Sequence, residues 1–120
     1  MIKYELKTKI PTLNEYVDAI NYNRHKGNNF KQAYVNEIMW LIKAQKVKKV
    51  KGKVDVYLTF IEKDTNRDKD NIISCGFKFI MDSLVNLDII KDDSWKYINQ
   101  YIPRVILGNE YKVIIELVEI

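Results

Sequence analysis

The segment from about Asn71 to Asn86 constrains the fold most, because its pattern is helical and it is apolar on two sides. One stripe consists of Ile73, Phe77, Ile80, Leu84 and Leu87, and much of the remaining surface carries Ile72, Phe79, Met81 and Val85. A helix that is apolar on two sides must pack against two partners. We expect one partner to be a β-sheet and the other to be either the first helices of the chain or a second subunit.

Alternating apolar and polar residues predict strands at 2–9, 54–61, 95–102 and 111–119. Pro103 and Gly108-Asn109 separate the last two strands, which indicates a hairpin. Thr12, with Glu15 as its capping-box partner, predicts the start of a helix that ends near Gly27. A further helix is expected from about Phe30 to Lys46. The order β-α-α-β-α-β-β predicts an α+β fold, in which a small mixed sheet packs with about three helices.

The length of 120 residues fits a single domain spanning 1–120. No apolar run reaches the roughly 18 residues of a membrane helix, and the first residues lack the apolar core of a signal peptide. The only cysteine, Cys75, has no partner for an internal disulfide. We therefore expect a cytoplasmic protein without a membrane partner.

Two acidic pairs flank the apolar helix: Asp68 with Asp70 before it, and Asp92 with Asp93 after it. In an extended segment, residues two apart point to the same side. Neighbouring carboxylates repel each other unless a cation or a proton lies between them. Carboxylate oxygens suit Mg²⁺ or Mn²⁺ better than zinc. The hypothesis is a divalent-metal site built from the four aspartates, which requires the fold to bring the two pairs together.

Other chemistries fit the sequence less well. An EF-hand loop starting at Asp64 would have Lys69 at its glycine position and Cys75 at its glutamate position. The only histidine, His25, is expected at the surface, and Cys75 is expected to be buried and inert. Trp40 and Trp95 favour core or interface positions over base-stacking ones.

Polar and basic residues leave alternatives open. Asn71, Ser74, Lys78 and Asp82 share one face of the apolar helix, either as its solvent edge or as part of the acidic site. The net charge is +4, and lysines cluster at positions 43, 46, 48, 49, 51 and 53. This cluster is either a solvated loop or a surface that contacts phosphates.

Three stretches resemble the RusA family of Holliday junction resolvases, in the form common in phages and prophages of Gram-positive bacteria. They are Arg67-Asp68-Lys69-Asp70-Asn71, the helix with Lys78 and Met81-Asp82-Ser83-Leu84, and Ile90-Lys91-Asp92-Asp93. Leu13-Asn14-Glu15-Tyr16, Asn23-Arg24 and Trp95-Lys96-Tyr97-Ile98 are similar as well. The resemblance therefore spans nearly the whole chain.

The resemblance implies a magnesium-dependent endonuclease, an intertwined homodimer that resolves branched DNA during recombination and repair in a bacterial host cell. Its essential carboxylates would be Asp68, Asp70 and Asp93, assisted by Asp92. The family's functional lysine would fall on Ser74, so Lys78, one turn further on, is the nearest candidate. The expected DNA contacts are Lys46, Lys48, Lys49, Lys51, Lys53, Arg67 and Lys69.

Three alternatives remain. One is a nuclease of looser specificity that cuts flaps or forks. Another is a catalytically inactive DNA-binding relative, which the serine at position 74 would explain. The last is a small structural or regulatory protein whose aspartates cap a helix N-terminus, where negative charge is favourable.

Overall fold

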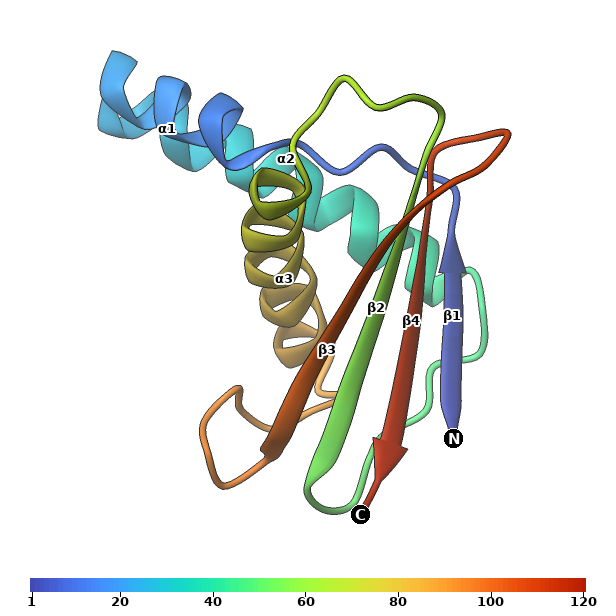
Figure 1. The fold of residues 1–120 in the computed structure, drawn as a ribbon. Coiled ribbons are helices and arrows are strands. Elements are labelled where there is room, and N and C mark those ends of the chain that lie inside the picture. The colour runs from blue at the N-terminus through green and yellow to red at the C-terminus, as the bar shows by residue number, and fades with distance from the viewer.

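The computed structural model describes all 120 residues and has the expected α+β fold. The elements are β1 (Ile2–Leu6), α1 (Leu13–Tyr22), α2 (Arg24–Lys43), β2 (Val54–Glu62), α3 (Lys69–Asn86), β3 (Ile98–Leu107) and β4 (Lys112–Glu119). The four strands form one mixed sheet in the order β1-β4-β2-β3, and the three helices lie on one face of it (Figure 1). None of the helices has the length and apolar character of a membrane-spanning segment.

The predicted hairpin between the last two strands is wrong. β3 pairs in parallel with β2, whereas β4 pairs antiparallel with both β1 and β2. The reason is the connection through α3, because a helical crossover joins neighbouring strands that run in parallel. β3 is therefore an edge strand, where Pro103 is tolerated because one side of the strand needs no hydrogen-bond donors.

The boundary between the first two helices also differs from the prediction. Thr12 caps α1 as expected, since its hydroxyl accepts a hydrogen bond from the Glu15 N–H at 3.3 Å. The break comes at Asn23, not near Gly27, because the Asn23 Oδ1 accepts from the Lys26 N–H at 2.7 Å and starts α2. Gly27 lies inside α2, where a Cβ would come within 2.9 Å of Ile20. Glycine there permits the close crossing of the two helices.

Both apolar sides of α3 are covered within the chain. On one side Gly76 lies against the ring of Phe60 in β2. On the other, Phe79 is surrounded by rings from α1 and α2, with centroid distances of 5.1 Å to Tyr16 and 6.2 Å to Tyr34. The first helices are thus the second packing partner. A second subunit, the alternative partner, is not needed to cover α3.

The end of α3 determines where the second acidic pair lies. Asp88 has a left-handed backbone (φ 57°), its N–H donates to Val85, and the Ile89 N–H donates to Leu84 at 3.0 Å. This is a Schellman motif, which ends the helix and reverses the chain. The turn buries Ile89 and leaves Asp92 and Asp93 exposed.

Candidate functional site

The first acidic pair lies at the start of α3 and makes few contacts with the rest of the chain. Asp68 occupies the N-cap position, yet its side chain makes no capping hydrogen bond. Asp70 is in the first turn, where its carboxylate accepts only the Asn71 N–H, at 3.0 Å. Both side chains are exposed, and neither forms an ion pair. A capping hydrogen bond therefore does not account for Asp68, whereas Asp70 has the favourable place of an acidic residue in the first helical turn.

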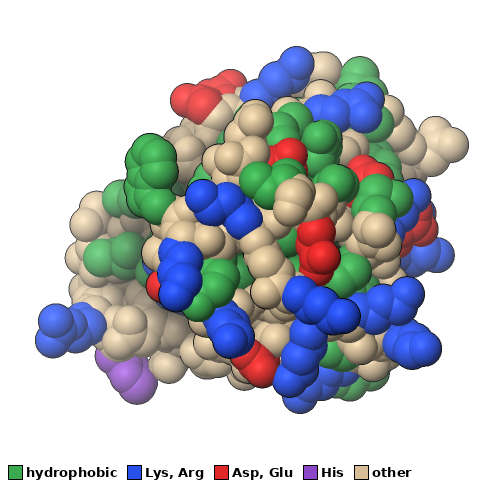
Figure 2. Space-filling view, turned by 90° about the horizontal axis from the view of Figure 1, so that it is seen from below, with side chains coloured by type: hydrophobic (Ala, Val, Ile, Leu, Met, Phe, Trp, Pro, Cys, Tyr) green, Lys and Arg blue, Asp and Glu red, His purple; other side chains and the backbone are tan.

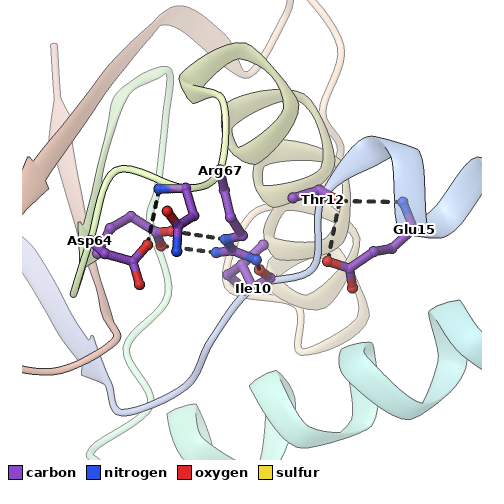
Figure 3. Close-up of polar contacts among 7 residues, drawn as sticks. Ile10, Thr12, Glu15, Asp64 and Arg67 are labelled. Atoms are coloured by element: carbon purple, nitrogen blue, oxygen red, sulfur yellow. Dashed lines mark hydrogen bonds and ion pairs between the residues drawn. The ribbon is translucent and has the colours of Figure 1, made fainter.

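A buried ion pair holds the loop that delivers Asp68. The Arg67 guanidinium donates to both carboxylate oxygens of Glu62, at 2.8 and 2.9 Å, and also to the Ile10 carbonyl at 2.5 Å (Figure 3). Only 11% of the Arg67 side chain and 7% of the Glu62 side chain is exposed. Burial opposes the charge of Arg67, but the hydrogen bonds and charge of Glu62 outweigh it and raise the pKa of Arg67. We call this arrangement the Glu62–Arg67–Ile10 clamp.

The clamp gives Arg67 a structural role that we did not expect, and its expected contact with DNA stays a prediction. Each nitrogen of its guanidinium donates one hydrogen bond within the chain, so in this structure Arg67 supports the loop. Sequence reasoning also missed Glu62. The available signal was its position at the end of β2, on the same face as the buried residues Val54, Val56, Leu58 and Phe60.

A cleft of about 540 Å³ opens beside Asp68. It lies between the loop after β2 and the end of β3, and its lining includes Asp64, Lys69, Val105, Ile106 and Leu107. The strand contributes apolar side chains and the loop contributes charged ones. We call it the Asp68 cleft.

The second acidic pair lies at the opposite end of α3. The Asp92 carboxylate accepts the Asp93 N–H at 2.9 Å, and neither residue forms an ion pair. Asp93 lines a cavity of about 210 Å³ together with Asp82 and Asn86 of α3 and Lys31 of α2. Burial raises the pKa of Tyr101 most, and the negative charge of Asp93 raises it further. Asp93 therefore lies beside the last turns of α3.

One chain alone does not bring the two acidic pairs together. Twelve residues of α3 separate Asp70 from Asp82, the neighbour of Asp93, and that is about 18 Å of helix rise. No group of three or more acidic, histidine or cysteine side chains lies close enough to hold a metal ion. The ligand set expected from the sequence is thus split into two halves.

The polar face of α3 lies between these halves. The Lys78 Nζ is 3.6 Å from Asp82, which Lys31 also approaches, at 2.6 Å. The Ser74 hydroxyl donates to the Asp70 backbone carbonyl at 2.8 Å and is not directed at a carboxylate. Lys78 is more than half exposed, so its ammonium is accessible, but eight residues, about 12 Å of helix, separate it from Asp70.

The basic cluster lies at the same end of the molecule as the second acidic pair. Its lysines at 46, 48, 49, 51 and 53 are exposed in the loop between α2 and β2. The Val50 N–H donates to the Ile89 carbonyl at 2.9 Å, and the Lys49 Nζ lies 2.8 Å from Asp88. Figure 2 shows lysine and arginine side chains gathered over this end. Lys69, by contrast, lies beside Asp70 at the other end.

No protein-family model and no curated protein matches this chain. Its function is therefore inferred from its residues and from their arrangement.

Proposed function

We propose that this protein is a magnesium-dependent endonuclease that resolves Holliday junctions. The observation that carries the proposal is the state of Asp68 and Asp70. Both carboxylates are exposed and unpaired, and the buried Glu62–Arg67–Ile10 clamp fixes the loop that presents them. Carboxylates two residues apart on such a fixed loop repel each other less when a cation lies between them.

The complete site is proposed to form between two copies of the chain. The first residue of β3, Ile98, lines a cavity together with Asp93. The last residue of β3, Leu107, lines the Asp68 cleft. A two-fold axis near the middle of β3 would bring Asp92 and Asp93 of one copy to Asp68 and Asp70 of the other. The same axis would create two equivalent sites, which suits the two cuts that a four-way junction needs.

Side chains, not a continuous backbone ladder, would carry this contact. Pro103 lies in the middle of β3 and has no N–H to donate to a partner strand. The strand does expose Tyr101, Ile106 and Leu107, of which Leu107 is 62% exposed. These side chains supply apolar area for the association of two copies.

The residues suit Mg²⁺, with Mn²⁺ as an alternative, since all the proposed ligands are carboxylates. Asp68, Asp70 and Asp93 would hold the ion with help from Asp92, and it would activate water and neutralise charge on the scissile phosphate. Lys69 and Lys78 offset the negative charge of the carboxylates. The exposed lysines at 46, 48, 49, 51 and 53 contact the phosphates of the junction arms.

Ser74 favours a second candidate, a DNA-binding relative that binds branched DNA without cutting it. The serine stands where the family resemblance calls for a lysine, and its hydroxyl is used within the helix. A four-way junction assay separates this candidate from the nuclease, because both bind the junction but only one cleaves it.

The test compares a labelled four-way junction, a flap, a fork and a linear duplex, each with and without Mg²⁺. Asp70→Asn should reduce junction cleavage about 100-fold or more, because losing a metal ligand removes several kcal/mol of transition-state stabilisation. Asp18→Asn, which changes an exposed aspartate of α1, is the matched control. Cleavage without Mg²⁺, or by Asp70→Asn at the wild-type rate, would contradict the proposal, and equal cleavage of flaps would favour the looser nuclease.

A further inference from the structure

Trp95 is the most exposed large apolar side chain of the molecule. It lies in the turn between Asp93 and β3, and 93% of it is accessible to solvent. The neighbouring Lys96 ammonium lies over Tyr97 and not over Trp95. Trp95 also stacks on no other ring of the chain. Tryptophan is highly buried on average. Its position here excludes a core role and points to a binding role.

A complementary surface exists at the other end of the same molecule. The Asp68 cleft, at about 540 Å³, falls within the range of about 300–1,000 Å³ of pockets that hold organic groups. Val105, Ile106 and Leu107 give it an apolar wall. Asp64 and Lys69 lie at its charged side. No side chain of the same copy fills it.

We infer that Trp95 of one copy seats in the Asp68 cleft of a second copy, and that the two-fold axis makes the contact twice. This inference rests on the proposed two-copy site and deepens it. Trp95 follows Asp93 by two residues, a span of at most about 7 Å. Asp68 itself lines the cleft. Seating the indole therefore brings the second acidic pair to the first.

The cleft offers an opposite charge to each sign that accompanies Trp95: Lys69 for Asp92 and Asp93, and Asp64 for Lys96. Asp68 repels Asp92 and Asp93 unless the proposed Mg²⁺ lies between them, so the contact is tested with Mg²⁺ present. Stacking of a nucleic-acid base on Trp95 is the competing interaction, since the basic cluster lies at the same end of the molecule. Asp92 and Asp93 beside Trp95 repel phosphates until a cation is bound, so we favour the second copy. Stacking on DNA is therefore an outcome of the test and not the proposal.

Fluorescence and mass measurements without DNA test the inference. In Trp40→Phe, Trp95 is the only tryptophan, so dilution from high micromolar concentration should shift its emission to the red as copies separate. Trp95→Ala should weaken dimerisation at least about 30-fold, the effect of losing an interface hot spot. Leu107→Asp should do the same from the cleft side, whereas Trp40→Ala, which changes the exposed tryptophan of α2, should leave the dimer intact.

Three results would overturn the inference. The wild type could be a monomer at high micromolar concentration, or Trp95→Ala could dimerise as tightly as the wild type. The emission of Trp95 could also respond to a single-stranded oligonucleotide but not to dilution. Circular dichroism checks that each variant is folded. A dimer that depends on Trp95 but cuts no junction would refute the proposed function and support this inference, so the two failures are distinguishable.

Discussion

Replacing Arg67 with methionine tests whether the Glu62–Arg67–Ile10 clamp holds the loop that carries Asp68. Methionine keeps much of the aliphatic volume but removes both hydrogen bonds to Glu62 and the one to Ile10. It leaves a carboxylate that is only 7% exposed without a cation. Breaking a buried ion pair from one side costs about 3–5 kcal/mol. We expect a loss of about 3 kcal/mol, since the remaining exposure lets water reach Glu62.

Urea unfolding at pH 7 measures this loss directly, and thermal unfolding should show a midpoint lowered by roughly 10–15 °C. Glu62→Gln combined with Arg67→Met should be more stable than Arg67→Met alone, because it removes the unpaired charge. If Arg67→Met unfolds within about 0.5 kcal/mol of the wild type, the pair is effectively solvated. It would then be too weak to position Asp68.

Two further predictions concern the core. Gly76→Ala should destabilise the protein by about 1–3 kcal/mol, because the new Cβ would clash with the ring of Phe60. This clash should outweigh the better helix propensity of alanine. An unchanged urea midpoint would show that Phe60 can move aside. Burial raises the pKa of the Cys75 thiol from 9.0 to about 12. The native thiol should therefore react with a thiol reagent at least about 100-fold more slowly at pH 8 than the unfolded chain does. Because the folded state holds this proton more tightly, the free energy of unfolding should fall as pH rises above 9.0, and Cys75→Ala should remove that part of the decline.

Features with a local signal could be predicted from the sequence. The two apolar sides of α3 required two packing partners, and the structure supplies the sheet and the first helices. The cap at Thr12 was also readable, because its partner Glu15 is three residues away. At Asn23 the same kind of signal was overlooked in favour of Gly27, whose role is to permit close helix packing.

Features set by distant contacts could not be predicted. Nothing local to the segment 98–119 shows that β4 inserts between β1 and β2, so the two final strands looked like a hairpin. The inward orientation of Arg67 depends on Ile10, which is 57 residues away. The acidic pairs themselves were local signals. Their placement at opposite ends of α3 follows from the length of that helix, and we propose that a second copy completes each half.

The most direct measurement of the central claim mixes two variants that should each be inactive, Asp70→Asn and Asp93→Asn. After unfolding and refolding together, the mixed dimers should contain one site with Asp70 from one chain and Asp93 from the other. Such a mixture should recover Mg²⁺-dependent nicking of a four-way junction on one strand, without the paired second cut. If mixed dimers form and remain as inactive as either variant alone, the aspartates do not join across two copies and the account is wrong.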